Sequence, residues 1–480
     1  MDKKNPFKIP AGITLPNTVE GCHELITNLL GTISELFKRV EKLEIENREL
    51  KERLNNNSSN SSLPPSKDFK KKKITKPASK NKSGGQKGHK GHFRELLESD
   101  KVDAIINCTL PPECLCGGKI NLKDNYQRHQ VHELPTIKLH VTEYRLEKGC
   151  CTDCGRNQVA SLPEGVRWGI TGPRLTGFMS HLVSRYRLSR RELNEFLKEQ
   201  FNFRISLGTV FNKQKIVNAA LETSTAELLE AVKQSPSLNT DETGHNRDGK
   251  KQWMWGFVSS TAAYFSIQAS RGKKVLKALI GDFNNILISD RYAAYNYFDS
   301  SHRQICWAHL KRDFTRISEK EDKVVARIGK NLLMCEAELF KIWHLFKRHN
   351  ITRDELQRLA YPIRQHVGEL LEQGTYTDPK SKAVRFCKNL LEQFDALWTF
   401  LSTEYVEPTN NHAERCLRHS VIWRKNYFGT RSDYGSEFVA RTLSVIMTCK
   451  MQSKNTFEFI NDTLLSYFSR KTTPSLLINA

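Results

Sequence analysis

Apolar residues recur every seven positions near the amino terminus, in two registers three positions apart. The first register holds Ile26, Ile33, Val40, Asn47 and Leu54, and the second holds Leu29, Leu36, Leu43 and Leu50. This is the a/d pattern of a coiled coil, and β-branched residues with one asparagine at a and leucine at d favour two parallel strands. After a tail (residues 1–19), we expect residues 20–55 to form a homodimer or higher oligomer. The alternative is an amphipathic helix packed on its own chain.

A second helical pattern covers residues 166–225. Leu193, Phe196 and Leu197 mark one apolar stripe, and another helix is expected to begin after Ser206, a favourable N-cap residue. Its exposed leading face is expected to hold Gly208, Thr209, Asn212 and Lys213. A helix-turn-helix would place this face in the major groove of DNA, with the last three residues as contacts. Many helical hairpins share the pattern, so an ordinary helical pair is the alternative.

Strand patterns dominate residues 226–314. They predict a strand ending at Asp241, an alternating strand around Trp253, Trp255 and Phe257, a strand from Ala263 to Ile267, a helix capped near Gly281, and an apolar strand, Ile286 to Ile288, running into Asp290. This order is that of a ribonuclease H-like α/β core, in which the first and fourth strands are neighbours. Asp241 and Asp290 are therefore expected to face each other, whereas Glu242 alternates to the opposite face.

A third acid lies within NNHAERCLRHS, residues 410–420. Glu414, Leu417 and Val421 fall at i, i+3 and i+7, so Glu414 shares a stripe with side chains that should face a core. Burying a carboxylate there costs several kcal/mol unless a cation or donors meet it. Together with Asp241 and Asp290 it would suit two magnesium ions and an in-line displacement at phosphorus. The alternative is that these acids are merely solvated, since the 53 acids of the chain allow many triplets.

The stretch between the second and third acids is too long for a simple core. Its middle, KVVARIGKNLLMCEAELFKIWHLFKRH, carries apolar residues at helical spacing. We expect an α-helical insertion at residues 315–403, after which the core resumes at 404–435 and a helical segment follows at 436–480. The fold class expected is thus multidomain α/β.

The segment CWAHLKRDF precedes the predicted insertion. His309 is expected to touch a phosphate or a metal-bound water, with a structural role and a backbone partner as the alternative. Cys306 is interpreted as a core residue rather than as a metal partner of His309. Lys311 and Arg312 are expected to contact phosphates, because their helix begins beside the acids.

Charge narrows the range of partners. The chain carries 75 Lys and Arg against 53 Asp and Glu, a formal charge of +22, which favours a polyanion such as nucleic acid. Residues 56–92 concentrate this charge, with ten lysines and one acid between Ser66 and His92. We expect a disordered linker that contacts DNA through Lys70, Lys71, Lys72 and Lys73, or else a solubilising spacer. No signal peptide or membrane span is evident, so a cytoplasmic, nucleoid-associated protein is expected.

Cysteines cluster in residues 93–165. Cys108, Cys114 and Cys116 form one group, and Cys150, Cys151 and Cys154 form another. Two short thiolate turns of this kind are similar to a zinc ribbon, so Cys114, Cys116, Cys151 and Cys154 are expected to hold a structural zinc ion. Only one residue separates Cys114 from Cys116, so Cys108 could replace one of them. The alternative is a set of unligated thiols.

At these residues the chain resembles a known family. The segments NTDETGH, ISDRYAAY, CWAHLKRDF and NNHAERCLR, in this order, resemble the catalytic-core motifs of the insertion-sequence sixty-six family of bacterial DDE transposases. The linker segments NSSNSSLPPSKD and GGQKGHKGH, the cysteine pairs and NYFGTRSDYGSEFVARTLSVIMTCKM are also similar to that family. The spacing of the first cysteine pair is narrower than the family pattern.

The resemblance implies a function. Asp241, Asp290 and Glu414 would be the catalytic triad, with magnesium or manganese as the cofactor and the terminal inverted repeats of an insertion element as the substrate. Hydrolysis at the element's ends would free 3′ hydroxyls that attack target DNA, with companion proteins from the same element as further partners. Two alternatives remain: a non-enzymatic dimeric, zinc-containing DNA-binding protein, and a ribonuclease H-like structure-selective nuclease or resolvase.

Overall fold

The computed structural model describes residues 16–61, 68, 84, 88–91, 94–123, 126–377 and 381–477. The predicted DNA contacts Lys70, Lys71, Lys72 and Lys73 lie outside these residues. Two compact units divide the chain: the first comprises Met1–Lys70, Leu146–Asn194 and Ile205–Ala480, and the second comprises Lys71–Arg145 and Glu195–Arg204. Within the described ranges, helices are too short or too polar to cross a membrane.

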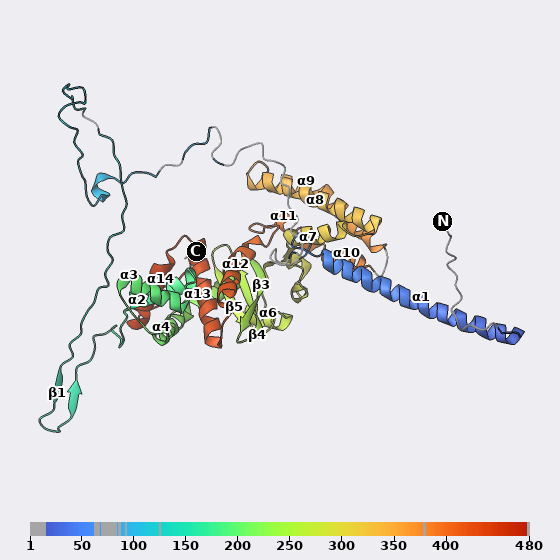
Figure 1. Ribbon diagram of the computed structural model, residues 1–480, viewed down its shortest axis with the longest axis horizontal. Helices are drawn as coiled ribbons and strands as arrows, with labels where there is room; N and C mark the ends of the chain where they lie inside the picture. Colours follow the sequence, from blue (N-terminus) through green and yellow to red (C-terminus); the bar gives the residue numbers. More distant parts are fainter. Residues whose placement is uncertain are drawn as a thin grey trace, which may run out of the picture. The chain divides into compact units, whose positions relative to one another are not determined.

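A five-stranded mixed sheet forms the centre of the first unit (Figure 1). Its strands are β3 (Ser237–Arg247), β4 (Lys250–Val258), β5 (Ala263–Gln268), β6 (Ile286–Ser289) and β7 (Arg303–Ile305), in the spatial order β5-β4-β3-β6-β7. β3 pairs antiparallel with β4 and parallel with β6, so the predicted neighbour relation of the first and fourth strands is confirmed. β7, which the sequence patterns did not indicate, extends the parallel side.

One predicted strand boundary is wrong. β3 does not end at Asp241 but continues to Arg247, because its second half pairs with β4 as one arm of a hairpin. The two hairpin residues, Asp248 and Gly249, have positive φ angles of 48° and 74°. An Asp-Gly pair with this backbone matches the twist of the flanking strands and is a strong hairpin signal. Asp241 therefore lies within β3.

Helices cover the sheet. Around it lie α5 (Glu222–Lys233), α6 (Lys273–Ile280), α7 (Trp307–Ser318), α12 (Asn411–Tyr427) and α13 (Asp433–Met451), while α2 (Pro173–Arg185), α3 (Arg190–Phe201), α4 (Leu207–Ala220) and α14 (Thr456–Phe468) complete the fold. α12 packs on β3 and β4, and α13 packs on β5. The predicted glycine cap of α6 is confirmed, since its backbone N–H at Gly281 bonds to Lys277.

Gly256 allows the close contact between α12 and the sheet. It is the β4 partner of Asp241 in register. A Cβ atom at this position would lie 3.2 Å from Leu417 of α12 and 2.9 Å from the Phe265 ring. A glycine here lets the helix that carries Glu414 approach the strand that carries Asp241.

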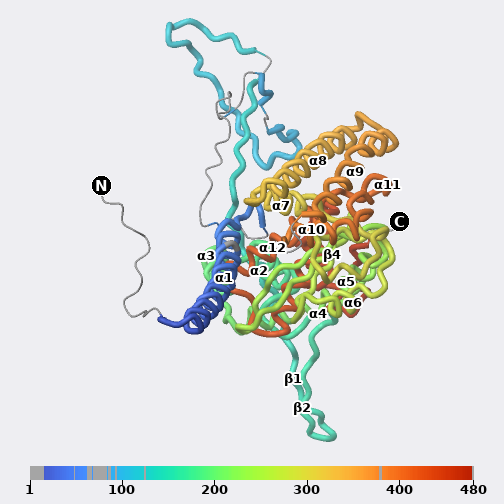
Figure 2. The backbone as a smooth tube through the Cα atoms, turned by 90° about the vertical axis from the view of Figure 1, so that its right-hand side faces the viewer, coloured from blue at the N-terminus to red at the C-terminus, as the bar shows by residue number. Residues whose placement is uncertain are grey.

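An α-helical layer follows α7 (Figure 2). It contains α8 (Lys323–Lys347), α9 (Arg353–Thr375), α10 (Lys382–Glu392) and the short α11 (Thr399–Ser402), with α8 packed on α7 and α9, and α9 on α10. Its apolar cluster is continuous with Ile288 of β6 and Ile305 of β7. Because α7 runs to Ser318, the predicted boundary at residue 315 falls inside a helix.

The predicted coiled-coil segment is one α-helix, α1 (Val19–Asn55). The apolar side chains at its a and d positions are exposed to solvent in this single chain, with exposed fractions from 46% at Ile33 to 71% at Leu54. The alternative of a stripe packed on its own chain is therefore not what the structure shows. Pairing with a second copy stays a prediction.

Regular structure is sparse among the described residues of the second unit. Apart from the end of α3, the element named there is a short 3-10 helix, Ser99–Lys101. Gln130 exchanges hydrogen bonds with the backbone of Leu97, and Glu113 forms an isolated bridge with Lys119. A segment with so little apolar core is typical of domains that depend on a metal ion for stability.

Candidate active site

The three predicted acids come from three separate elements of the first unit. Asp241 lies in β3, Asp290 directly follows β6, and Glu414 lies in the first turn of α12; all three are half-buried. Burial raises the pKa of Asp241 well above its ordinary value, and the charges of Glu242, Asp290 and Glu414 raise it further. Asp290 and Glu414 thus lie close enough to Asp241 for their charges to act on its carboxylate.

Backbone donors fix two of these acids. The N–H of Glu242 donates to Asp241 Oδ1 at 2.9 Å, and the N–H of Tyr292 donates to Asp290 Oδ1 at 2.8 Å. Such bonds hold a carboxylate in one orientation but do not neutralise its charge. Repulsion between the acids therefore remains for a cation to relieve.

Asn410 fixes the third acid and was missed in the sequence analysis. Its Nδ2 donates to the backbone oxygen of Thr240 at 2.7 Å, and its Oδ1 accepts from Nδ2 of Asn239 at 3.0 Å. Asn410 is fully buried and directly precedes α12. It therefore fastens the start of the Glu414 helix to the strand residue beside Asp241. The signal in the sequence was the asparagine pair before HAER, since buried asparagines need several partners.

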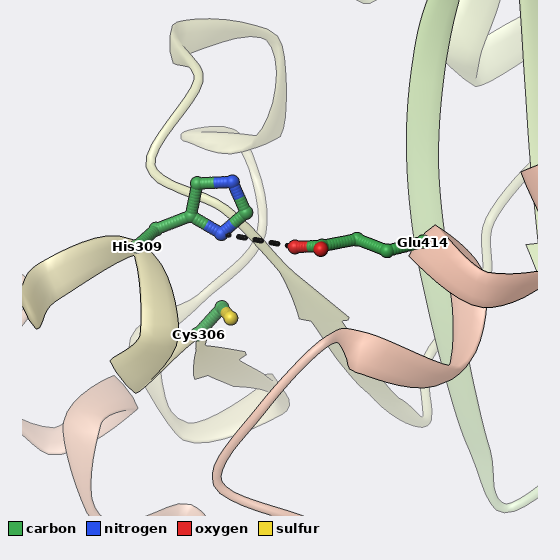
Figure 3. A group of neighbouring side chains, drawn as sticks. All are labelled: Cys306, His309 and Glu414. Atoms are coloured by element: carbon green, nitrogen blue, oxygen red, sulfur yellow. Dashed lines mark ion pairs between the residues drawn. The ribbon is translucent and has the colours of Figure 1, made fainter. Parts of the chain in front are cut away.

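His309 and Cys306 stand beside Glu414 (Figure 3). His309 Nδ1 lies 3.6 Å from Glu414 Oε1, and neither atom has a hydrogen-bond partner among the described residues. Cys306 Sγ belongs to the same group, in which all three ligand atoms lie within 4.8 Å of one another. Across the described part of the chain, no other set of three such side chains, including the three acids, meets this limit.

Cys306 is buried, as predicted for a core residue. Its Sγ accepts the backbone N–H of Asn410 at 3.1 Å, and burial raises the pKa of its thiol to about 11. Cys306 is the N-cap of α7 and His309 lies in the first turn of this helix, so both side chains come close to Glu414.

Glu242 points to the other face of the sheet, opposite Trp255 in register. Its carboxylate accepts from Tyr295 Oη at 2.7 Å and lies 3.6 Å from Arg271. Burial raises the pKa of Glu242 to about 7, with a further contribution from the charge of Asp290. Glu242 thus adds to the negative charge around Asp241 without lying on the α12 face.

Arg303 supports the segment that carries Asp290. It is 1% exposed, and its Nη2 donates to the backbone oxygen of Asp290 at 2.7 Å. Its Nη1 donates to Asn296 Oδ1 and Gln393 Oε1, at 3.0 and 2.8 Å. Gln393 follows α10, so this buried guanidinium joins the candidate site to the helical insertion.

The predicted DNA contacts in the helical pair differ in their exposure to solvent. Ser206 is the N-cap of α4 and accepts from the N–H of Thr209, which confirms the predicted helix start. Asn212 is exposed and Thr209 is half-buried. The prediction for Lys213 is wrong: it is buried, because it lies three residues after Val210 and four before Val217 on the inward stripe of α4.

The two predicted phosphate contacts on α7, Lys311 and Arg312, differ in whether their charge is paired. Lys311 Nζ bonds to both carboxylate oxygens of the buried Glu336, at 3.1 and 2.8 Å, so its charge is already matched within the chain. Arg312 is half-buried and has no ion-pair partner among the described residues. It remains the better candidate of the two for a phosphate.

Each cysteine pair forms a tight turn. In the first pair, Gly117 N–H bonds to the oxygen of Cys114, and the N–H of Gly118 and the Cys114 side chain lower the pKa of Cys116. In the second, N–H groups of Cys154 and Asp153 lower the pKa of Cys151. The second turn is closed by the short hairpin of β1 (Lys148–Cys150) and β2 (Asn157–Val159). Hydrogen-bond donors that stabilise the thiolate form of a cysteine favour metal binding, because the thiolate is the form that binds a metal ion.

Comparison with known proteins identifies the class. A family model described as Transposase IS66 family matches residues 175–437, more than half of the chain and all of the candidate site. Transposases are DNA-processing proteins. The chain belongs to the IS66 family of transposases, as the resemblance implied. Residues 17–95 also match a family of unknown function, DUF6444.

Three similar proteins come from Sinorhizobium fredii (strain NBRC 101917 / NGR234). Uncharacterized protein y4qI is 25% identical over 49% of this chain and 49% of its own length, so this match spans about half of that protein. Uncharacterized protein y4hP is 22% identical over 74% and 70% of the two chains, and Uncharacterized protein y4jD is 23% identical over 78% of each.

Proposed function

We propose that this transposase cuts DNA at the terminal inverted repeats of an insertion element and joins the freed 3′ hydroxyls to target DNA. The observation that carries the proposal is the raised pKa of Asp241, which shares its surroundings with the charges of Asp290 and Glu414. The strand order, with an antiparallel arm beside β3 and parallel strands on its other side, supports a ribonuclease H-like core.

The donor set fits magnesium or manganese. Asp241, Asp290 and Glu414 offer carboxylate oxygens, which these hard cations prefer. Two bound cations would also neutralise the negative charges that raise the pKa of Asp241. When bound, such ions supply charge stabilisation to the attacking and leaving oxygens of an in-line displacement. The residues of the chain hold the geometry: Asn410 fixes the start of α12, and Arg303 fixes the segment after β6. His309 lies where it can face a phosphate beside Glu414.

A joining assay tests the function against its two alternatives. The full-length protein is incubated in Mg²⁺ with labelled element ends and a supercoiled target plasmid. A transposase gives joined products, a structure-selective nuclease gives cut branched DNA without joining, and a non-enzymatic regulator gives neither. Cut ends without joined products would contradict the proposal.

Thermal stability should depend on pH and on Mg²⁺ together. Because the pKa values of Asp241 and Glu242 are raised in the folded state, the fold is more stable when these groups are protonated. This stability is lost as pH rises from the ordinary carboxyl range through about 7, the pKa of Glu242. We therefore expect Mg²⁺ to raise the Tm by a few degrees near neutral pH and by less in acid.

Differential scanning calorimetry of two asparagine variants checks this expectation. Asp241→Asn cannot ionise, so most of the Mg²⁺-dependent rise in Tm should disappear. Asp282→Asn makes the same chemical change at an exposed carboxylate after α6 and should keep the wild-type response. An equal rise in both variants would show that Mg²⁺ binds elsewhere.

We also propose that α1 pairs with a second copy. Apolar side chains at the a and d positions are exposed, and their burial in a partner helix would stabilise a dimer. Leu36→Glu with Leu43→Glu is expected to give a single 55.3 kDa chain by light scattering, because the seam would bury charges. The control, Lys38→Glu with Lys42→Glu, introduces two glutamates at positions outside a and d and should leave a dimer. Identical masses for the two variants would exclude this interface.

The cysteine turns are proposed to hold zinc, and the basic linker and α4 to contact DNA. Cys116 and Cys151 support the first point through their lowered pKa values. Asn212, exposed in the first half of α4, supports the second. Companion proteins of the same element are proposed as partners in assembling the two ends.

A further inference from the structure

The group formed by Cys306, His309 and Glu414 has a chemistry different from that of the three acids. It offers one sulfur, one imidazole nitrogen and one carboxylate oxygen, all within 4.8 Å of one another. Magnesium prefers oxygen ligands, whereas sulfur with nitrogen favours zinc and related metals. Glu414 belongs to both sets. A metal that binds one set therefore competes with a metal that binds the other.

The geometry is close to that of a zinc site. Zinc bonds of about 2.0–2.3 Å in a tetrahedron place neighbouring ligand atoms roughly 3.3–3.7 Å apart. His309 Nδ1 and Glu414 Oε1 are already 3.6 Å apart. Cys306 Sγ lies within 4.8 Å of both atoms and would be the third corner. Figure 3 shows the imidazole facing the carboxylate, with the sulfur beside them.

Two further observations point to a ligand. His309 Nδ1 and Glu414 Oε1 are buried and accept or donate no hydrogen bond among the described residues, which is costly unless a partner arrives. Cys306 Sγ accepts the N–H of Asn410 at 3.1 Å, a bond that would stabilise a thiolate bound to metal. Cys306 is the N-cap of α7 and His309 lies in its first turn, so one helix start supplies two of the three ligands.

We propose that Cys306, His309 and Glu414 form a binding site for Zn²⁺. Zinc bound there inhibits the enzyme, because Glu414 is then no longer available to bind Mg²⁺ together with Asp241 and Asp290. Binding forms bonds from zinc to sulfur, nitrogen and oxygen, and the thiol proton passes to solvent. Water fills the fourth position. Binding itself is independent of the proposed function, whereas the inhibition rests on it.

Zinc occupancy is the primary test. The full-length protein and its variants are dialysed against a buffer of fixed free Zn²⁺, and bound zinc is counted by mass spectrometry. Cys306→Ser is expected to hold about one zinc ion fewer per chain than wild type, or to need at least about tenfold more free zinc for the same occupancy. Cys335→Ser removes another buried thiol, in α8, and should match wild type. Equal occupancy in all three proteins overturns the proposal.

A second variant and a second readout guard against misfolding. His309→Leu is expected to lose the same zinc ion, and circular dichroism establishes that each variant is folded. In the joining assay with Mg²⁺, each protein's rate in zinc is divided by its own rate without zinc. The zinc concentration for half-inhibition should rise at least about tenfold in Cys306→Ser. Zinc binding without any joining activity would overturn the proposed function alone, whereas unchanged inhibition in Cys306→Ser would overturn this site's role.

Discussion

Replacing Glu414 by glutamine is expected to reduce strand joining by more than about 100-fold in Mg²⁺, since loss of an outer-shell partner alone costs 10–100-fold at metal sites. Glutamine keeps the size of the side chain but removes a charge that raises the pKa of Asp241. The fold should survive, because the carboxylate oxygen Oε1 forms no hydrogen bond among the described residues. DNA binding should also survive.

The measurement is joined product per unit time, with a filter-binding assay for DNA. Glu404→Gln is the matched control: it makes the same substitution at an exposed position in the loop before α12. We expect wild-type joining from it. Joining by Glu414→Gln at the control rate would mean that the third metal carboxylate lies elsewhere.

The second large effect is expected at Arg303. Arg303→Met would leave unpaired the acceptors of Asp290, Asn296 and Gln393, each of which is bonded to the guanidinium. An unsatisfied buried acceptor costs about 1–3 kcal/mol, so we expect a loss of about 3–5 kcal/mol in the free energy of unfolding. Because Arg303 binds the backbone of Asp290, joining should also fall.

Arg303→Lys separates charge from geometry. Lysine keeps the cation but lacks the planar fork that reaches several acceptors, so an intermediate loss is expected. The control is Arg316→Met, which removes an exposed arginine paired with Asp313 and should cost about 1 kcal/mol or less. Urea unfolding followed by tryptophan fluorescence gives the values. A loss at Arg303 no larger than at Arg316 would rule out its positioning role.

Local patterns predicted much of the sheet. The strands around Trp255, Ala263 and Ile286 and the glycine cap at Gly281 are where the sequence placed them, since alternation and left-handed turns leave direct marks. The strand holding Asp241 was cut short because the Asp-Gly turn after it was not used. β7 was missed because it has three residues, too few for a period to appear.

Side-chain partners were harder to predict. Lys213 was expected on the exposed leading face of its helix, yet its place three residues after Val210 puts it on the inward face. Lys311 was expected to be free for phosphate, but Glu336 comes from α8 and meets it only in the folded chain. Asn410 carried no periodic signal, although it ties α12 to β3.

The sequence by itself determined the family, the identity of the three acids as candidates, the period of α1 and most strand boundaries, because these depend on residue type and spacing along the chain. The tertiary structure decided what those residues meet. It brought Cys306 and His309 to Glu414, and it used Arg303 to join the insertion to Asp290. The physical reason is that burial and charge act across space, between groups that the chain separates by many residues.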